Sequence, residues 1–367
     1  MSTSIPETMA AVLLTGHGGV DKLEYRRDVA VPAPGASEVL IRIAAAGVNN
    51  TDINTRVGWY SKQVTGATNT GGDAGFAEAA GEDGSWAGTP LSFPRIQGAD
   101  CCGRIVAVGE GADAARVGDR VIVRSCMLGY TDSRPFESCW LGSEHDGAFA
   151  EYVCVPSLDA FAVDCDWTDV ELASIPCAYS TAENLLHRSG VASGERVLIT
   201  GASGGVGSAA VQLARCRGAE VAAVAGASKA EWVHRLGAGR VIDRDEDPVA
   251  AVGRDSVDVV IDLVAGPRWA RLLDALRRGG RYATSGAIAG PMVELDIRTL
   301  YLKDLSFHGC TWQESGVFGN LVRYIEEGRI RPLVSRTYSL AEIVEAQRDF
   351  IAKKYPGKLV LVPPGER

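Results

Sequence analysis

The feature that most constrains the fold is a glycine-rich turn between an apolar strand and a helix, in residues 196–218. Residues 197–200 read V-L-I-T, which predicts a strand buried on both faces, and apolar residues then recur at helical spacing until Gly218. Glycines there permit a tight turn, close backbone approach to a pyrophosphate, and close packing of the helix, whose N-terminus favours an anion. Since Ser203 replaces the middle glycine of the strict motif, the loop alone leaves open another kind of glycine-rich turn. The expected cofactor contacts are Gly201, Ala202, Ser203, Gly204, Gly205, Val206 and Gly207.

The flanking sequence favours the dinucleotide-binding interpretation. Further strands are predicted at 221–224, 257–264 and 281–285, separated by helices at 229–236 and 269–276. Strands that alternate with helices indicate a parallel, doubly wound sheet. The expected fold class is therefore α/β, with a Rossmann domain.

Composition limits the class of partner. A length of 367 residues suits two domains, and a net charge of −9 argues against a nucleic-acid partner, which lysine and arginine clusters would bind. The sequence shows neither a signal peptide nor an apolar run long enough for a membrane span. Nine cysteines without a paired framework suit free thiols in a reducing cytoplasm.

The rest of the chain is β-rich at both ends. Strands are expected at 9–14, 23–27, 38–45, 96–108, 121–123, 147–153, 305–310 and 358–362, and helices at 169–190 and 340–351. The N-terminal part and the C-terminal tail are expected to form one domain of residues 1–180 and 316–367, into which the dinucleotide domain of residues 181–315 is inserted. Residues 61–94 lack periodicity, which is consistent with a lid, a binding loop or a partly disordered segment.

Several ordered motifs resemble the medium-chain dehydrogenase/reductase superfamily, and within it the zinc-lacking quinone oxidoreductase branch. They are A-G-V-N-N-T-D-I-N-T-R-V-G-W-Y (46–60), G-A-D-C-C-G-R-I-V-A-V-G (98–109), V-G-D-R-V (117–121), G-A-F-A-E-Y (147–152), G-A-S-G-G-V-G (201–207) and G-K-L-V-L-V-P (357–363). The resemblance covers almost the whole chain and implies that the β-rich part is a GroES-like catalytic domain. The segment 61–94 departs from the compact family pattern.

The resemblance also allows a prediction of whether the chain has the ligands for zinc. Where zinc-containing members carry a cysteine, a histidine and a later cysteine, this chain has Asn49, Ala99 and Cys177. A catalytic zinc needs three protein ligands, so none is expected. The four cysteines Cys101, Cys102, Cys126 and Cys139 lack the C-x-x-C spacing of a structural zinc site. Alcohol oxidation would lose its Lewis acid, whereas hydride transfer to a quinone or to a C=C bond conjugated to a carbonyl remains accessible.

The cofactor expected is NADPH. An NAD enzyme usually places an acid just after the second strand to bind the ribose hydroxyls, and none stands in 224–229. Ser228 and Lys229 could hold a 2′-phosphate, with Arg244 as a weaker candidate; alternatively Lys229 begins a solvated helix. The resemblance implies that Thr181 and the segment Ser285, Gly286 and Ala287 lie near the nicotinamide. Thr181 could equally bond back to its own helix.

The resemblance further implies that Asn49, Asp52 and Tyr60 line the reaction site. Tyr60 is expected to contact the substrate or donate a proton, although it could be an amphipathic core residue, and Asp52 is expected to be structural. The leading hypothesis is an NADPH-dependent quinone or alkenal/enone reductase acting on a small molecule. The alternatives are an enoyl-thioester (enoyl-CoA type) reductase and a non-catalytic NADPH-binding protein. Family resemblance suggests a homodimer built through edge strands of the nucleotide domain.

Overall fold

The computed structural model describes residues 5–79 and 83–365, which divide into two compact units. The first unit comprises the chain up to Val64, Gly71–Cys177, and the chain from Pro332 onward; the second comprises Thr65–Thr70 and Ala178–Arg331. Residues 316–331 therefore lie in the second unit rather than with the C-terminal tail. The reason is local packing: Arg329 donates to the carbonyl oxygen of Cys216, and Arg331 N donates to Gln212 Oε1 at 2.9 Å.

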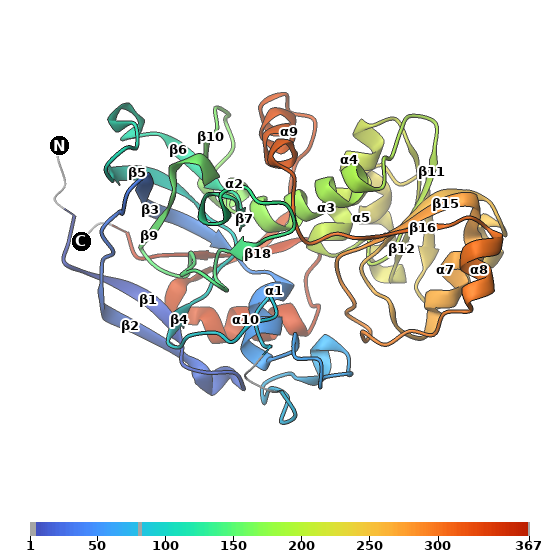
Figure 1. The fold of residues 1–367 in the computed structure, drawn as a ribbon, viewed down its shortest axis with the longest axis horizontal. Coiled ribbons are helices and arrows are strands. Elements are labelled where there is room, and N and C mark those ends of the chain that lie inside the picture. The colour runs from blue at the N-terminus through green and yellow to red at the C-terminus, as the bar shows by residue number, and fades with distance from the viewer. Residues whose placement is uncertain (1–4, 80–82, 366–367) are drawn as a thin grey trace. The chain divides into compact units, whose positions relative to one another are not determined.

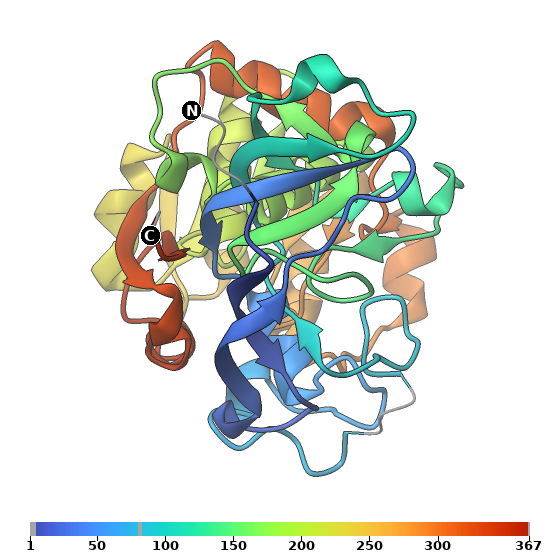
Figure 2. The same ribbon diagram turned by 90° about the vertical axis from the view of Figure 1, so that its left-hand side faces the viewer.

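The first unit is built on β-sheets (Figure 2). Its central sheet has the order β10-β6-β5-β3-β18-β17, with β9 also paired to β3, and a smaller sheet has the order β2-β1-β4. The elements are β1 (Thr8–Leu14), β2 (Leu23–Ala30), β3 (Glu38–Gly47), α1 (Asn50–Val57), β4 (Arg95–Ile96), β5 (Cys102–Val108), β6 (Arg120–Val123), β7 (Cys126–Met127), β8 (Cys139–Trp140), β9 (Tyr152–Pro156), β10 (Ala160–Ala162), α2 (Asp169–Leu172), β17 (Val334–Ser339), α10 (Ile343–Ile351) and β18 (Lys358–Val362).

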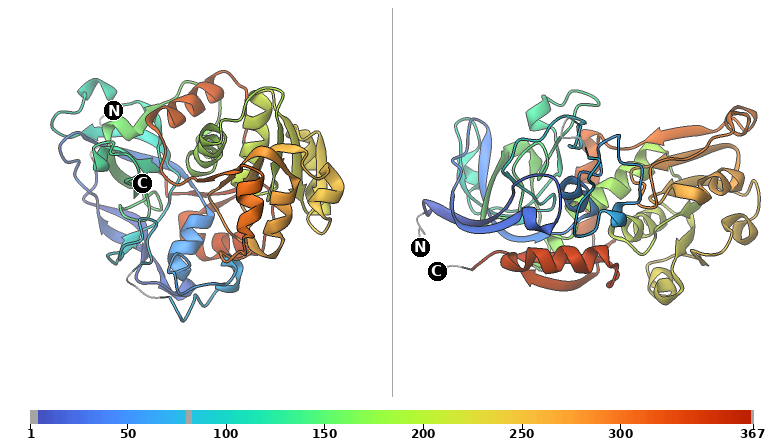
Figure 3. Two further views of the ribbon diagram at one scale, coloured as in Figure 1. Left: turned by 45° about the vertical axis from the view of Figure 1, so that its right-hand side comes forward. Right: turned by 90° about the horizontal axis from the view of Figure 1, so that it is seen from below.

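One strand pairing in this sheet positions the site described below. β18 runs antiparallel to β3, with Val360 opposite Gly47 and Leu361 opposite Ala46. Continued past the end of β3, this register sets Lys358 opposite Asn49, and Val48 N donates to Leu359 O at 2.9 Å. Helix α10, red in Figure 3, packs beside β17 and β18.

The second unit contains a six-stranded parallel sheet of order β13-β12-β11-β14-β15-β16 (Figure 1). The elements are α3 (Pro176–Arg188, which begins at the end of the first unit), β11 (Arg196–Ile199), α4 (Gly205–Cys216), β12 (Glu220–Ala225), α5 (Ala230–Arg235), β13 (Arg240–Asp243), α6 (Pro248–Val252), β14 (Val257–Asp262), α7 (Trp269–Ala275), β15 (Leu276–Thr284), α8 (Ile297–Leu302), β16 (Ser306–Gly309) and α9 (Ser315–Glu326). The strand order reverses between β11 and β14, which is the switch point of a doubly wound sheet. The expected Rossmann and GroES-like α/β fold class is confirmed.

Three predicted elements were wrong in their bounds. The strand expected at 96–108 is divided into β4 and β5, and the one expected at 147–153 begins only at Tyr152, after a loop whose backbone still bonds to β1. The helix expected at 169–190 is broken between α2 and α3 because Pro176 disfavours helical geometry at the residue before it.

The segment 61–94 is held to the first unit in much of its described part; residues 80–82 lie outside the described residues. Its anchor is Arg56, whose side chain is fully buried in α1. Arg56 donates to Gly72 O of the segment at 3.1 Å, to Gly18 O at 2.9 Å and to Gln347 Oε1 of α10 at 2.7 Å. Burial lowers the pKa of this guanidinium to about 10. One buried cation thus joins three distant parts of the chain through neutral oxygens.

We predict that Arg56→Met lowers the free energy of unfolding by about 3 kcal/mol, because it leaves one buried and two partly buried acceptors without this donor. The control is Arg348→Met, which removes a half-exposed ion pair with Asp73 and should cost less than about 1 kcal/mol. Urea unfolding followed by circular dichroism measures both. Equal losses in the two variants would contradict this role for Arg56.

Candidate functional site

The first unit contains a buried polar network around Asn49. Its amide Nδ2 donates to Asp100 Oδ2 at 2.8 Å, and its Oδ1 accepts from Lys358 Nζ at 2.5 Å. Lys358 Nζ also lies 2.8 Å from Asp100 Oδ2, and Cys177 N donates to Asp100 Oδ1 at 2.6 Å. Lys358 is 3% exposed and Asp100 is 0% exposed. A charge pair this deep is stable only because each ion has further hydrogen-bonding partners.

Helix α1 adds a second carboxylate to the network. The backbone N of Asn49, the residue before α1, donates to Asp52 Oδ2 at 2.8 Å, which closes the first turn of the helix. Gly58, with φ of 78°, ends the helix in the left-handed conformation. The pKa of Asp52 is raised to about 7, chiefly by burial and also by the charge of Asp100, whereas the hydrogen bond from Asn49 N and the charge of Lys358 act in the opposite direction.

Tyr60 lies two residues beyond the end of α1. Its hydroxyl donates to Thr51 Oγ1 at 3.1 Å and is not hydrogen-bonded to Asn49 or Asp52. Burial raises the pKa of the Tyr60 phenol above its ordinary value. The structure therefore brings Asn49 and Asp52 together, and the hydrogen bond to Thr51 holds Tyr60 against the first turn of the same helix.

In the second unit, the predicted cofactor residues gather at the carboxyl ends of the strands. Gly201–Gly207 follows β11, Ser228 and Lys229 follow β12, Arg244 follows β13, and Ser285–Ala287 follows β15. Parallel strands bring these ends to one edge of the sheet, where open α/β folds bind ligands. Thr181 lies on α3 and is 6% exposed.

The glycine loop has a backbone geometry that favours glycine at two of its positions. Gly201 has φ of 61°, and a side chain at Gly207 would collide with the backbone of Gly201 and Ala202, so α4 packs directly against the turn. Gly204 precedes α4, and no described side chain caps the helix there. The first N–H groups of α4 remain able to bind an anion.

Asp262 fixes the neighbouring turn. This buried carboxylate accepts from Thr200 Oγ1 at 2.5 Å and from Tyr282 Oη at 2.7 Å, and it also accepts from the backbone N of Val264 and Ala265. Thr200 immediately precedes the glycine loop. The network therefore fixes the start of the glycine loop, which follows β11, against the end of the neighbouring strand β14.

The sequence patterns missed Asp100 and Lys358 as members of the site. Asp100 interrupts the apolar run predicted as one strand, and Lys358 begins a strand whose next residues are buried. A charged residue within a run of buried residues usually has an oppositely charged or hydrogen-bonding partner, and this rule could have marked both residues as members of a buried polar site. The identity of the partner depends on the β3–β18 register.

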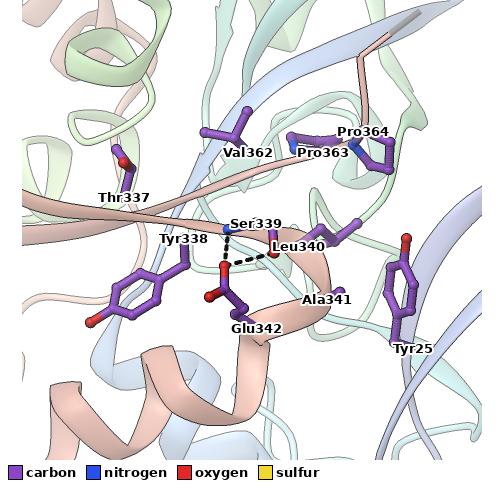
Figure 4. Close-up of a pocket in the computed structure, with 10 residues that line it drawn as sticks. All are labelled: Tyr25, Thr337, Tyr338, Ser339, Leu340, Ala341, Glu342, Val362, Pro363 and Pro364. Atoms are coloured by element: carbon purple, nitrogen blue, oxygen red, sulfur yellow. Dashed lines mark hydrogen bonds between the residues drawn. The ribbon is translucent and has the colours of Figure 1, made fainter. Parts of the chain in front are cut away.

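A pocket of about 480 Å³ in the first unit contains no member of this network (Figure 4). Its lining includes Tyr25, Tyr338, Glu342 and Pro363. The carboxylate of Glu342, its one ionisable acid, accepts from the backbone N and hydroxyl of Ser339 at 2.7 Å. The pocket is therefore separate from the predicted chemistry.

Comparison with known proteins identifies the family. Residues 35–164 match the family described as alcohol dehydrogenase GroES-like domain, and residues 205–327 match the one described as zinc-binding dehydrogenase. The quinone oxidoreductase of Lama guanicoe is 30% identical over 96% of this chain and 97% of its own length. An NAD-dependent alcohol dehydrogenase of Sulfurisphaera tokodaii is 28% identical over 97% of this chain and 100% of its own length.

A solved structure of a candidate alcohol dehydrogenase from Sinorhizobium meliloti 1021 is 49% identical, with a TM-score of 0.87 over 98% of each chain. The chain therefore belongs to the medium-chain dehydrogenase/reductase superfamily, oxidoreductases that bind a nicotinamide cofactor. None of the described helices has the length and apolar character of a membrane span.

The residues at the expected zinc positions do not form a suitable ligand set. Both polar atoms of the Asn49 side chain are already hydrogen-bonded, Ala99 offers no donor atom, and the ammonium of Lys358 would repel a metal ion. Cys177 packs in an apolar cluster with Ala99, Cys126 and Trp140. Among the described residues, no group of three or more histidine, cysteine or acidic side chains is arranged to hold a metal.

We predict that Asp52 makes stability depend on pH. The folded protein retains the Asp52 proton up to about pH 7, whereas an unfolded aspartate loses it near pH 4, so folding becomes less favourable as the pH rises through this interval. Asp52→Asn keeps an acceptor for Asn49 N and removes this titration. Urea midpoints between pH 4.5 and 8 should therefore decrease less with pH in the variant than in the parent protein. Parallel pH profiles would contradict the assignment.

Proposed function

We propose that this protein is an NADPH-dependent, zinc-independent reductase of quinones or of C=C bonds conjugated to a carbonyl. The observation that carries the proposal is the buried Asn49–Asp100–Lys358 network, in which both polar atoms of the Asn49 side chain, at one of the expected zinc positions, are already hydrogen-bonded. Without a Lewis acid to stabilise an alkoxide, alcohol oxidation is disfavoured. Hydride addition to an electron-poor carbon needs no metal, because the acceptor itself delocalises the added charge.

The chain's own residues would bind and orient the reactants. The bound nicotinamide supplies the hydride. The glycine loop and the N-terminus of α4 would hold the pyrophosphate, and Asp262 would keep that loop in place. The raised pKa of Tyr60 keeps its phenol protonated, so the hydroxyl, on turning away from Thr51 Oγ1, can donate its hydrogen bond to a developing enolate oxygen. The final proton would come from solvent.

The preference for NADPH is supported by two cations at the carboxyl ends of β12 and β13. A side chain at Gly226 would collide with the Arg244 guanidinium, which therefore lies over the turn after β12. Burial lowers the pKa of Lys229, and the positive charge of Arg244 also lowers it. Two neighbouring cations and no acid after β12 suit a 2′-phosphate.

The proposed assembly is a homodimer. β16 is an edge strand of the sheet, and it pairs only with β15 among the described strands. Phe307 of β16 is 38% exposed, and Ile297, Tyr301 and Leu302 of α8 are each more than half exposed. A second copy that pairs with the free edge of β16 would cover both the strand and this apolar surface.

We place the protein in the cytoplasm, because all nine cysteines are free thiols.

The test is turnover of the purified protein on a panel of acceptors with NADPH and with NADH. The panel contains a quinone, an enone, crotonyl-coenzyme A and, in the oxidative direction, a primary alcohol with NADP⁺ or NAD⁺. We expect NADPH-dependent reduction of the quinone or enone. Turnover confined to the thioester would indicate an enoyl-thioester reductase, and alcohol oxidation alone would contradict the proposal. Tight NADPH binding without turnover would indicate a non-catalytic binding protein.

We predict that Lys229→Ala and Arg244→Ala each raise KM for NADPH by about tenfold and leave KM for NADH unchanged, because only NADPH carries the phosphate. The control is Arg240→Ala, which removes an exposed arginine at the opposite end of β13. Steady-state kinetics with both cofactors measures the effect. Equal changes in KM for NADPH and NADH would show that these cations do not bind the 2′-phosphate.

A further inference from the structure

The turn after β12 packs against an arginine side chain that comes from the end of the next strand. Gly226, the first residue after β12, has φ of −69°, an ordinary value that does not by itself require glycine. A methyl group at this position would lie 2.5 Å from Nη2 of Arg244 and 3.1 Å from its Cζ. The absence of a side chain at Gly226 therefore makes room for the Arg244 guanidinium.

The backbone of Arg244 is held on both sides of its α-carbon. Its N donates to Ala225 O, the last residue of β12, at 3.0 Å. Its carbonyl oxygen accepts from Nη1 of Arg268, the residue before α7, and the same nitrogen donates to Glu246 O at 3.5 Å. These bonds fix the residue that follows β13 against both β12 and the start of α7. The Arg244 side chain thus begins from a fixed point.

The donors of the Arg244 guanidinium are not used within the protein. Among the residues that the structure describes, no acceptor or acid is paired with this group. The acids of the same loop are engaged elsewhere. Asp243 Oδ1 accepts from Asp245 N at 2.8 Å, and Glu246 Oε2 accepts from Asp243 N at 3.2 Å. Asp245 also lies 3.7 Å from Arg268. An arginine with unused donors is suited to bind a phosphate through two parallel hydrogen bonds.

A second cation stands in the same turn. Lys229 N donates to Gly226 O at 2.9 Å, so Lys229 and the Arg244 guanidinium both contact the turn at Gly226. Two like charges at one turn repel each other, and a bound dianion would remove this repulsion. The turn therefore favours a phosphate monoester over a neutral hydroxyl group.

We propose that Gly226 and Arg268 determine the preference for NADPH by positioning Arg244. Gly226 leaves the space and Arg268 holds the peptide group, so the guanidinium is in place before the cofactor arrives. The 2′-phosphate then binds without first having to order a long side chain. This inference rests on the proposed function and deepens it, because it names residues that set the cofactor choice without being expected to touch the phosphate.

The test is calorimetric binding of NADPH and of NADH, without an acceptor, to the purified protein and its variants. Gly226→Ala should weaken NADPH binding about fivefold and NADH binding less than twofold, because the methyl displaces only the flexible end of the Arg244 side chain. The matched control is Gly239→Ala. That glycine is exposed, the nearest atom would lie 3.7 Å from the added methyl, and neither cofactor should bind differently.

Arg268 is tested by a pair of substitutions. Arg268→Ala should weaken NADPH binding about threefold with little change for NADH, because the carbonyl of Arg244 loses its donor. Arg268→Lys retains a donor for that carbonyl and should restore most of the affinity. Equal losses for NADPH and NADH in Arg268→Ala would overturn its role in cofactor choice.

A double-mutant cycle separates positioning from direct contact with the phosphate. In the Arg244→Ala background, Gly226→Ala and Arg268→Ala should cause no further loss of NADPH affinity, because both act through the Arg244 guanidinium. A further loss for Arg268→Ala would mean that Arg268 binds the phosphate itself, and its positioning role would be rejected. NADPH binding that is unchanged by Gly226→Ala alone would overturn the role of Gly226.

These outcomes are distinct from failure of the proposed function. A parent protein that binds NADH as tightly as NADPH would reject the NADPH dependence itself. A parent that prefers NADPH but is insensitive to Gly226→Ala and Arg268→Ala would reject only the positioning. The expected losses in a protein that reduces no acceptor of the panel would uphold the positioning and reject the reductase activity.

Discussion

The ion pair between Lys358 and Asp100 is the interaction on which the arrangement of the first unit depends. Both ions are almost completely buried, so the loss of either would leave the other without compensation in a low-dielectric interior. The pair joins the last strand to Asp100, two residues before β5, and Asn49 bridges it to the start of α1. The same few atoms thus fix the C-terminal tail, the helix that leads to Tyr60, and the residues at the expected zinc positions.

This arrangement accounts for how a member of a family named for zinc can lack a ligand set for it. Next to Asn49 the site holds the ammonium of Lys358, and the carboxylate of Asp100 compensates that charge. Asp52 is the second buried acid, and its raised pKa favours the neutral carboxyl below about pH 7. The charges balance internally, which leaves the acceptor's own electron deficiency to drive hydride transfer in the function we propose.

The sequence predicted those parts of the fold that local patterns determine. The glycine loop, the alternating elements after it and Gly218 at the end of α4 follow from spacing and backbone freedom, and the structure has them. Helix α1 was missed because N-T-D-I-N-T-R-V contains few strong helix formers, and its first turn depends on the side chain of Asp52. The partnership of Asn49 with Lys358 spans 309 positions and follows only from the β3–β18 register, which no local pattern encodes. The contact of the Arg244 guanidinium with the turn at Gly226 is equally a tertiary property.

The measurement that tests the central claim most directly is the metal content of the purified protein, combined with its activity after exhaustive dialysis against a zinc chelator. If Asn49, bonded to the Lys358 ammonium, cannot serve as a metal ligand, the protein will contain no stoichiometric zinc and will lose no reductase activity on dialysis. One equivalent of zinc per chain, with activity that disappears on chelation and returns when zinc is restored, would contradict the account.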